Sequence, residues 1–336
     1  MHQHNPNPPR IAVIGGGSWA TALIKILCEQ DVQIQWWLRS EQDVAHIQAY
    51  HHNPHYLSDI SIDPAKVQAT TDIKAAIHNV RYVLLVVPAA FAREPLAMLQ
   101  AEDFEGKILV SAVKGMIPER NLLLTELLEQ DFQVPRELIA VIAGPCHAEE
   151  VALERQSYLT IASAHLHTAE QVAALLQCRY IKATPFDDLM GVEYCAVMKN
   201  IIALASGIAH GLGFGDNFQA VMVTNALAEI KRFIDTVYPL HRELTKTAYL
   251  GDLLVTAYSQ FSRNRTFGNM IGRGYTVQSA QVEMNMIAEG YFAVKSIQAI
   301  NRKYGVVMPI TEAVYRILYE KSASKKEFDL LKDSFV

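Results

Sequence analysis

Short apolar runs recur through the first half of the chain and are separated by more polar stretches. Runs of this length without helical spacing are typical of buried strands in a parallel sheet. The stretches between several of them repeat apolar residues every three or four positions, which indicates helices. Strands that alternate with helices predict a doubly wound, mostly parallel α/β sheet with helices on both faces. The predicted strands are 11–14, 32–38, 82–87, 107–113 and 138–143, with 158–162 and 180–183 as edge strands.

The pattern changes near residue 190, where strand-like runs disappear and helical periodicity continues to the end of the chain. We therefore expect a flexible tail over 1–10, an α/β domain over 11–190 and an all-α helical domain over 191–336. The helices expected in the second domain are 192–210, 217–236, 242–260, 278–304 and 309–320.

Composition narrows the class of protein. The 336 residues carry a net charge of −5, which gives no reason to expect a nucleic-acid partner. The four cysteines form no C-x-x-C pair, so we expect free thiols in a reducing, cytoplasmic setting. No apolar run is long enough to span a bilayer, and the His-, Asn- and Pro-rich start of the chain does not resemble a signal peptide.

A glycine-rich turn follows the first predicted strand. Gly15-Gly16-Gly17-Ser18-Trp19-Ala20 matches the G-x-G-x-x-A pattern between a strand and a helix. Gly15 allows a sharp turn, Gly17 leaves bare backbone for a pyrophosphate, and small Ala20 lets the helix pack closely on the strand. The helix N-terminus would offer amide groups to the phosphates. The segment 11–190 is therefore predicted to be a dinucleotide-binding domain of the Rossmann type.

The choice of cofactor is expected at the end of the second strand. An acidic residue there would bind the ribose 2′-hydroxyl of NAD. This chain has Arg39 instead, and Glu41 comes two residues later. Arg39 is either a contact for the 2′-phosphate of NADP or a solvated surface arginine. We expect NADP or NAD as cofactor, with NADPH slightly favoured, and no metal.

Two lysines are candidates for a substrate site. Lys114 follows a predicted strand at the carboxyl edge of the sheet, where doubly wound folds bind ligands. Lys199 lies on a helix whose neighbouring positions are small and apolar, which would desolvate the amine and lower its pKa. Such a lysine can exchange a proton with a substrate hydroxyl. Alternatively, its ammonium simply reaches water along the helix surface.

Polar residues farther along the chain complete a candidate substrate site. Asp252 is either a helix N-cap or a carboxylate that holds a lysine or a substrate hydroxyl. Ser262, Arg263 and Asn264 form a plausible phosphate clamp, with a basic loop as the alternative.

Two other stretches invite functional interpretations that their spacing does not favour. The histidines of 46–55 do not match a zinc motif, and Pro54 indicates a loop. Cys146 is adjacent to His147, but adjacency in sequence does not make a catalytic pair, and a buried free thiol is the better interpretation.

Taken together, these residues resemble the bacterial NAD(P)-dependent sn-glycerol-3-phosphate dehydrogenases from Gly15 to about Glu320. The matching segments are GGGSWATA (15–22), VVP (86–88), VKG (113–115), AGP (143–145), VMKN (197–200), GLGFGDN (211–217), GDL (251–253), SRNR (262–265), FG (267–268), EG (289–290) and MPI (308–310).

The resemblance implies an enzyme that interconverts dihydroxyacetone phosphate and sn-glycerol 3-phosphate for glycerophospholipid synthesis. It implies Lys199 as the proton donor and acceptor. It implies substrate contacts at Lys114, Gly144, Cys146, Lys199, Asn200, Asp252, Ser262, Arg263 and Asn264, and cofactor contacts at Gly15, Gly17, Ser18, Trp19, Arg39, Lys114, Ala148, Arg263, Ile287 and Glu289.

Three positions depart from the family pattern. Ala20 replaces the glycine that many members carry, and it is tolerated because it is small. Cys146 stands where the family usually has Ser or Thr, and a thiol is a weaker hydrogen-bonding partner. Asn225 stands where related chains often have an arginine. The resemblance leaves two alternatives: a dehydrogenase of the same two-domain plan for a 3-hydroxyacid or 6-phosphogluconate, or a non-enzymatic NAD(P)-binding sensor. The partners expected are a phosphorylated small molecule and a second copy of the chain in a homodimer.

Overall fold

The computed structural model of the protein describes residues 8–284 and 288–335. It forms two compact units, Met1–Val113 with Leu124–Leu189, and Lys114–Leu123 with Met190–Val336. The segment Lys114–Leu123, which the sequence pattern assigns to the first domain, lies with the second unit. Residues 1–7, most of the expected tail, lie outside the described residues.

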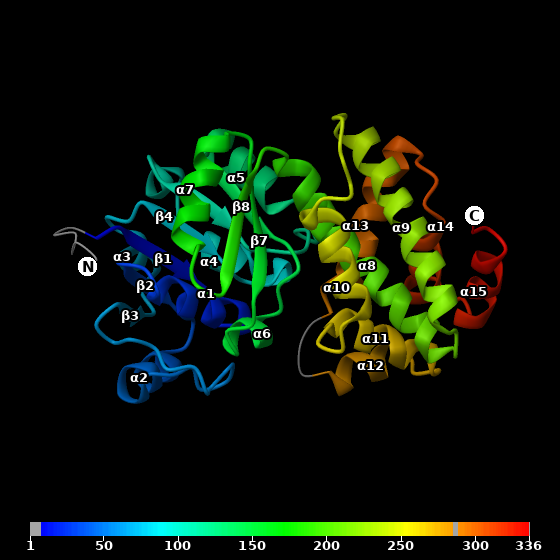
Figure 1. Cartoon of the computed structure of the whole chain (residues 1–336), viewed down its shortest axis with the longest axis horizontal. Coiled ribbons are helices and arrows are strands. Elements are labelled where there is room, and N and C mark those ends of the chain that lie inside the picture. Colours follow the sequence, from blue (N-terminus) through cyan, green and yellow to red (C-terminus); the bar gives the residue numbers. More distant parts are fainter. Residues whose placement is uncertain (1–7, 285–287, 336) are drawn as a thin grey trace. The chain divides into compact units, whose positions relative to one another are not determined.

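The first unit is built on one eight-stranded sheet with the order β3-β2-β1-β4-β5-β6-β7-β8 (Figure 1). All neighbouring strands are parallel except β6 and β7, which are antiparallel. This topology confirms the Rossmann-type sheet expected from the sequence. The strands are β1 (Arg10–Ile14), β2 (Gln33–Trp37), β3 (Val67–Thr70), β4 (Tyr82–Leu85), β5 (Ile108–Ser111), β6 (Ile139–Ala143), β7 (Ser157–Ser163) and β8 (Ile181–Phe186).

The central strands are apolar because helices cover both faces of the sheet. Strands β4, β5 and β6 are buried at every position. The edge strand β3 was not predicted, since it is four residues long and buries only Ala69. The helices of this unit are α1 (Ser18–Cys28), α2 (Glu41–Tyr50), α3 (Ile73–Ile77), α4 (Arg93–Leu96), α5 (Leu124–Phe132), α6 (Ala148–Ala152) and α7 (Leu166–Leu176), with short 3-10 turns at Ala89–Phe91, Ala101–Phe104 and Arg136–Leu138.

The second unit is helical, as expected, and its core helix is α8 (Leu189–Gly211). Helix α8 is long and apolar enough to cross a membrane, but its apolar stretch is entirely buried inside the protein, as in the core helix of a globular unit. The other elements are α9 (Asp216–Val237), the π-helical turn η4 (Thr247–Gly251), α10 (Asp252–Tyr258), α11 (Arg263–Gly272), α12 (Val277–Glu283), α13 (Glu289–Tyr304), α14 (Pro309–Tyr319) and α15 (Ser324–Lys332).

Helix boundaries in this unit differ from the periodicity-based prediction. The stretch 242–260 is not one helix, because a π-helical turn at Thr247–Gly251 precedes α10. The stretch 278–304 is two helices, α12 and α13. Helices α11 and α15 were not predicted. Asn, Arg and Gly make up six of the ten residues of α11 and give little apolar periodicity, so packing decides the conformation there.

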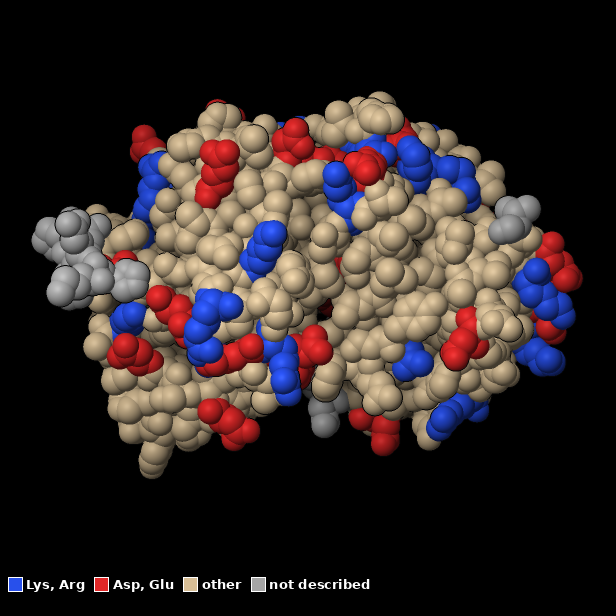
Figure 2. All heavy atoms as spheres, in the orientation of Figure 1, with Lys and Arg blue, Asp and Glu red and all other residues tan. Residues whose placement is uncertain are grey.

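Acidic and basic side chains lie close to one another over much of the face drawn in Figure 2. Neither sign of charge dominates that face, and the whole chain carries a net charge of −5. A bound anion needs a local site under these conditions, because the overall field does not attract it.

Candidate cofactor and substrate sites

The glycine-rich turn joins β1 to α1 in a conformation that needs its glycines. Gly15 has φ +133°, and a Cβ there would lie 2.1 Å from the Val86 carbonyl oxygen. At Gly17, by contrast, a Cβ would meet no atom within 4 Å. The first glycine is thus required by packing within the unit, whereas the third leaves space above the start of α1. An uncovered helix N-terminus next to bare backbone fits the pyrophosphate of a dinucleotide.

Arg39 follows β2 at the carboxyl edge of the sheet, just before α2. Its side chain is 82% exposed, and its Nη1 lies 3.7 Å from Glu94 Oε2. An ion pair this exposed contributes little to stability and leaves the guanidinium able to change partner. Arg39 is therefore accessible to a ribose phosphate at the strand end where such a group is expected.

The other first-unit candidates are more deeply placed. Gly144 has φ +111°, and a Cβ there would lie 2.6 Å from the Tyr158 carbonyl oxygen. The Cys146 thiol belongs to the apolar core, and its sulfur lies 3.9 Å from the same carbonyl. Ala148 is buried at the start of α6, which packs on α1, and Trp19 is half-buried in α1. All four cysteines are free thiols.

In the second unit, Lys199 of α8 and Asp252 of α10 form a buried ion pair. The Lys199 Nζ donates a hydrogen bond to Asp252 Oδ1, and the two side chains are only 3% and 1% exposed. The pairing is between residues far apart in sequence. Of the two alternatives for Asp252, the N-cap is wrong, because Gly251 is the N-cap of α10 and Asp252 is the first residue of the helix; its carboxylate instead holds a lysine. The lysine is not one that merely reaches water.

The surroundings of Lys199 set its protonation. Burial lowers the pKa of its amine to about 8, Asp252 opposes this change, and the charge of Lys114 reinforces it. A buried lysine that remains mostly protonated at neutral pH, yet lies within about one unit of losing its proton, suits general acid–base chemistry.

Two asparagines connect the lysines to two other segments of the second unit. Asn200 Nδ2 donates to the Lys114 carbonyl oxygen at 2.7 Å, and Asn200 Oδ1 accepts from Asn264 Nδ2 at 2.9 Å. Asn264 Oδ1 then accepts from the Gly290 amide at 2.8 Å. The bond to the Lys114 carbonyl is a contact within the second unit, to which Lys114 belongs. The network also fixes both amide planes, since each side chain uses a donor and an acceptor on the protein.

The remaining second-unit candidates lie at helix starts. Ser262 caps α11, and its Oγ accepts from the Arg265 amide at 3.3 Å. Arg263 is the first residue of α11 and is exposed, while Glu289 is the first residue of α13 and is half-buried. Ile287 lies outside the described residues.

Sequence reasoning missed how α11 is positioned. A Cβ on Gly207 of α8 would lie 2.0 Å from the Arg265 carbonyl oxygen, and one on Gly268 of α11 would lie 2.1 Å from the Leu204 carbonyl oxygen. The two helices therefore touch backbone to backbone, which holds the start of α11 beside Asn200. The signal in the sequence was the G-x-x-x-G spacing at Gly207 and Gly211 and again at Gly268 and Gly272.

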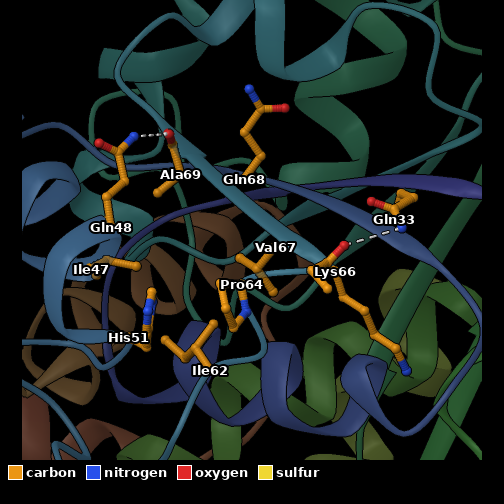
Figure 3. A pocket seen from close by; sticks show the side chains of 11 residues that line it. Gln33, Ile47, Gln48, His51, Ile62, Pro64, Lys66, Val67, Gln68 and Ala69 are labelled. Atoms are coloured by element: carbon orange, nitrogen blue, oxygen red, sulfur yellow. Dashed lines mark hydrogen bonds between the residues drawn. The ribbon is translucent and has the colours of Figure 1, made fainter.

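A surface cavity of about 370 Å³ lies beside the edge strand β3 (Figure 3). Two of its polar side chains already have partners: Lys66 Nζ donates to the Cys28 and Gln30 carbonyl oxygens, and Gln48 donates to the Ala69 carbonyl oxygen. None of the candidate residues lines this cavity.

Two models of one known protein family match consecutive parts of the chain. The model described as NAD-dependent glycerol-3-phosphate dehydrogenase N-terminus matches residues 10–169, and the corresponding C-terminus model matches residues 188–329. Together they span most of the chain.

Whole proteins and a solved structure agree with these matches. A glycerol-3-phosphate dehydrogenase (NAD(P)+) from Exiguobacterium sp. is 36% identical over 318 residues, covering 94% of this chain and 93% of that protein. The enzyme of the same name from Streptococcus uberis is 37% identical over 321 residues, covering 94% of each chain. The crystal structure of glycerol-3-phosphate dehydrogenase from Coxiella burnetii has a TM-score of 0.89 at 31% identity, covering 97% of this chain and 99% of that chain.

Proposed function

The chain belongs to the NAD-dependent glycerol-3-phosphate dehydrogenase family, and from this we propose that it reduces dihydroxyacetone phosphate to sn-glycerol 3-phosphate with Lys199 as the proton donor. It is an NAD(P)-dependent oxidoreductase that acts on a CH–OH group. The observation that carries the residue assignment is the buried Lys199–Asp252 pair.

Lys199 would act on the carbonyl oxygen of the substrate. When bound, the nicotinamide supplies the hydride. As negative charge develops on the carbonyl oxygen, the ammonium of Lys199 stabilises it and then transfers a proton to it. An ammonium has three N–H donors, and Asp252 accepts from one of them, which orients the group. A pKa of about 8 makes the proton transfer feasible near neutral pH.

Two positively charged side chains, Arg263 and Lys114, are proposed to bind the negatively charged substrate. Arg263 is exposed at the start of α11, where its guanidinium and the helix amides favour an anion. The carbonyl oxygen of Lys114 accepts a hydrogen bond from Asn200, the residue that follows Lys199, and this contact holds Lys114 close to the Lys199–Asp252 ion pair. Asn200 and Asn264 orient the neighbouring groups, and Ser262 caps α11.

On the cofactor side, we propose that the amides of Gly16, Gly17 and Ser18 receive the pyrophosphate, with Trp19 and Ala148 of the same unit as further contacts. The family resemblance adds Glu289 as a proposed cofactor contact. Arg39 is proposed to favour NADPH over NADH by pairing with the 2′-phosphate, since its guanidinium is exposed at the end of β2. The substitution Arg39→Asp should reverse the ratio of kcat/KM for the two cofactors.

The cellular setting is part of the proposal. The free thiols favour a cytoplasmic location, and the product would supply the backbone of glycerophospholipids. We propose a homodimer as the working state, which sedimentation velocity would test.

The deciding experiment measures oxidation of NADPH and NADH with dihydroxyacetone phosphate in the wild-type protein and in Lys199→Ala. We expect turnover in the wild type and a loss of about a hundredfold or more in kcat in the variant, which is the range for losing a general acid. A variant that keeps the wild-type kcat would remove Lys199 from this role. Oxidation of the reduced cofactor only with a non-phosphorylated 3-oxoacid, and not with dihydroxyacetone phosphate, would reject the substrate.

A further inference from the structure

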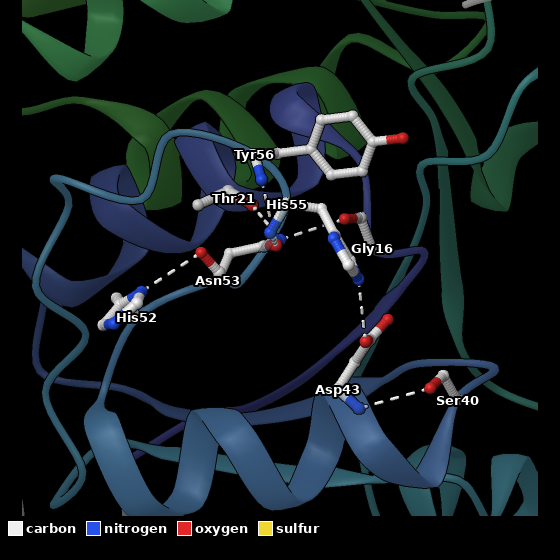
Figure 4. Close-up of polar contacts among 8 residues, drawn as sticks. All are labelled: Gly16, Thr21, Ser40, Asp43, His52, Asn53, His55 and Tyr56. Atoms are coloured by element: carbon white, nitrogen blue, oxygen red, sulfur yellow. Dashed lines mark hydrogen bonds and ion pairs between the residues drawn. The ribbon is translucent and has the colours of Figure 1, made fainter. Parts of the chain in front are cut away.

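The loop after α2 contains a fully engaged asparagine. Asn53 is 1% exposed, and Figure 4 shows its side chain between the glycine-rich turn and its own loop. Its Nδ2 donates to the Gly16 carbonyl oxygen at 3.0 Å and to Thr21 Oγ1 at 2.8 Å. Its Oδ1 accepts from the amides of His55 and Tyr56 at 2.9 and 3.2 Å.

All the hydrogen-bonding capacity of this amide is therefore used, two donors and two acceptor positions. The two sides of the side chain face chemically opposite groups, oxygens on one side and amides on the other. Only an asparagine fits such surroundings at this length. An aspartate would place an oxygen against two oxygens, and an apolar residue would leave buried polar groups without partners.

The carbonyl groups of the neighbouring glycines are held in the same way. The Gly15 carbonyl oxygen accepts from the indole Nε1 of Trp36 at 2.6 Å. The Gly17 carbonyl oxygen accepts from Thr21 Oγ1 at 3.1 Å, in addition to the helical bond from the Thr21 amide. Each of the three successive glycine carbonyls thus has a donor within the unit.

Fixing a carbonyl also fixes the next amide. In a trans peptide the C=O and the following N–H lie in one plane and point in opposite directions. With the carbonyls of Gly15, Gly16 and Gly17 held toward the protein, the amides of Gly16, Gly17 and Ser18 are directed to the other side of each peptide plane. The orientation of the Gly17 amide depends on Asn53, because Asn53 donates to the Gly16 carbonyl oxygen of the same peptide.

We propose that Asn53 is a positioning residue for the cofactor: it holds the Gly16–Gly17 peptide so that its amide is oriented in advance toward the pyrophosphate. This inference rests on the proposed placement of the pyrophosphate at the glycine-rich turn. A preorganised donor binds an anion more tightly than a mobile one, because the backbone loses no further freedom on binding.

The other contacts of the loop supply a matched control. His55 Nε2 lies 3.1 Å from Asp43 Oδ1 on α2, and the Asp43 amide donates to Ser40 Oγ (Figure 4). The histidine side chain is 62% exposed, and it attaches the loop to α2 without touching the glycines. His55→Ala therefore loosens the loop on its outer side and leaves the Asn53 amide contacts to the turn in place.

The experiment compares Asn53→Ala, Thr21→Val, Thr21→Ser and His55→Ala. For each variant, the dissociation constants of NADPH, ADP-ribose and adenosine 2′-phosphate are measured by calorimetry, together with kcat at saturating NADPH. ADP-ribose contains the pyrophosphate, whereas adenosine 2′-phosphate lacks it. Melting temperatures establish that each variant is folded.

In Asn53→Ala we expect the affinity for NADPH and ADP-ribose to fall about ten- to a hundredfold, the range for losing one or two buried hydrogen bonds. Affinity for adenosine 2′-phosphate and kcat should change less than about threefold, since neither uses the reoriented amide. Thr21→Val should show a smaller loss of the same kind, while Thr21→Ser and His55→Ala should match the wild type.

Two results would overturn the inference. One is an unchanged affinity for ADP-ribose in Asn53→Ala. The other is an equal loss for adenosine 2′-phosphate, which would mean that Asn53 only maintains the fold. If Asn53→Ala does not fold, the comparison of Thr21→Val with Thr21→Ser decides in the same way. A wild-type protein that binds no NADPH would refute the proposed function itself, which is a distinct outcome.

Discussion

Replacing Asp252 with asparagine isolates the electrostatic part of the proposed site. Asparagine has nearly the same shape and can still accept a hydrogen bond from Lys199, but it carries no charge. Burial and the charge of Lys114 lower the pKa of Lys199, and the charge of Asp252 is the strongest influence that raises it. Removing the carboxylate must therefore move the pKa further down.

The magnitude follows from the buried geometry. A neighbouring opposite charge moves a pKa by about 1 to 3 units, so a loss of about 2 units is expected. With a pKa of about 8, about nine-tenths of Lys199 is protonated at pH 7. With a pKa of about 6, only about one-tenth would be protonated, and the rate of ketone reduction at pH 7 should fall about tenfold from this cause alone.

The assay is the pH dependence of kcat/KM for reduction of dihydroxyacetone phosphate. Because the reaction in this direction needs the protonated lysine, the descending limb at alkaline pH should shift to lower pH in Asp252→Asn, and the two enzymes should converge in acid. Asp216→Asn is a matched control, since Asp216 is also the first residue of a helix but is exposed. Superimposable profiles for Asp252→Asn and wild type would refute the electrostatic role of Asp252.

Three further predictions concern binding and stability. Arg263→Ala should raise KM for the phosphorylated substrate about ten- to a hundredfold, the range for losing a charged hydrogen bond, with little change in kcat. Steady-state kinetics in which kcat falls and KM does not change would contradict this. Gly268→Ala should lower the free energy of unfolding in urea titrations by about 3 kcal/mol, because the new Cβ would lie 2.1 Å from the Leu204 carbonyl oxygen. Gly215→Ala should have little effect, because a Cβ there meets open space. Burial raises the pKa of Glu229 from 4.5 to about 7, so the folded protein binds the proton more tightly than the unfolded chain does. The resulting stability is fully present below pH 4.5 and is lost as the pH rises through 7, and the free energy of unfolding falls by about 3 kcal/mol over this range. Glu229→Gln should therefore show a flatter dependence of unfolding free energy between pH 5 and 8 than the wild type, and equal slopes would rule this out.

The sheet and the glycine-rich turn could be predicted because their causes are local. A strand buried on both faces must be apolar along its whole length, as at Tyr82–Leu85, so its sequence identifies it directly. The turn at Gly15 needs a positive φ that only glycine adopts easily, and the following helix begins at once. Helix α8 was also clear, since apolar residues cover all of its faces.

The elements that escaped prediction depend on contacts between distant segments. Helix α11 has little apolar periodicity, and it is held against α8 by close backbone contact at Gly207 and Gly268. The short strand β3 exists because it pairs with β2. The local sequence of α11 or of β3 does not reveal the element, because each is stabilised by another segment of the same chain.

The same division applies to the candidate site. The sequence by itself determined which residue types were present: a lysine on an apolar helix, an acid at a helix start and a polar run at Ser262. Tertiary structure alone decided that Lys199 and Asp252 form a buried pair, that Asn200 and Asn264 link Lys114 to Gly290, and that Asn53 holds the turn at Gly16. The physical reason is that hydrogen bonds and charge pairs act only over a few ångströms, so they depend on which distant segments the packed core brings into contact.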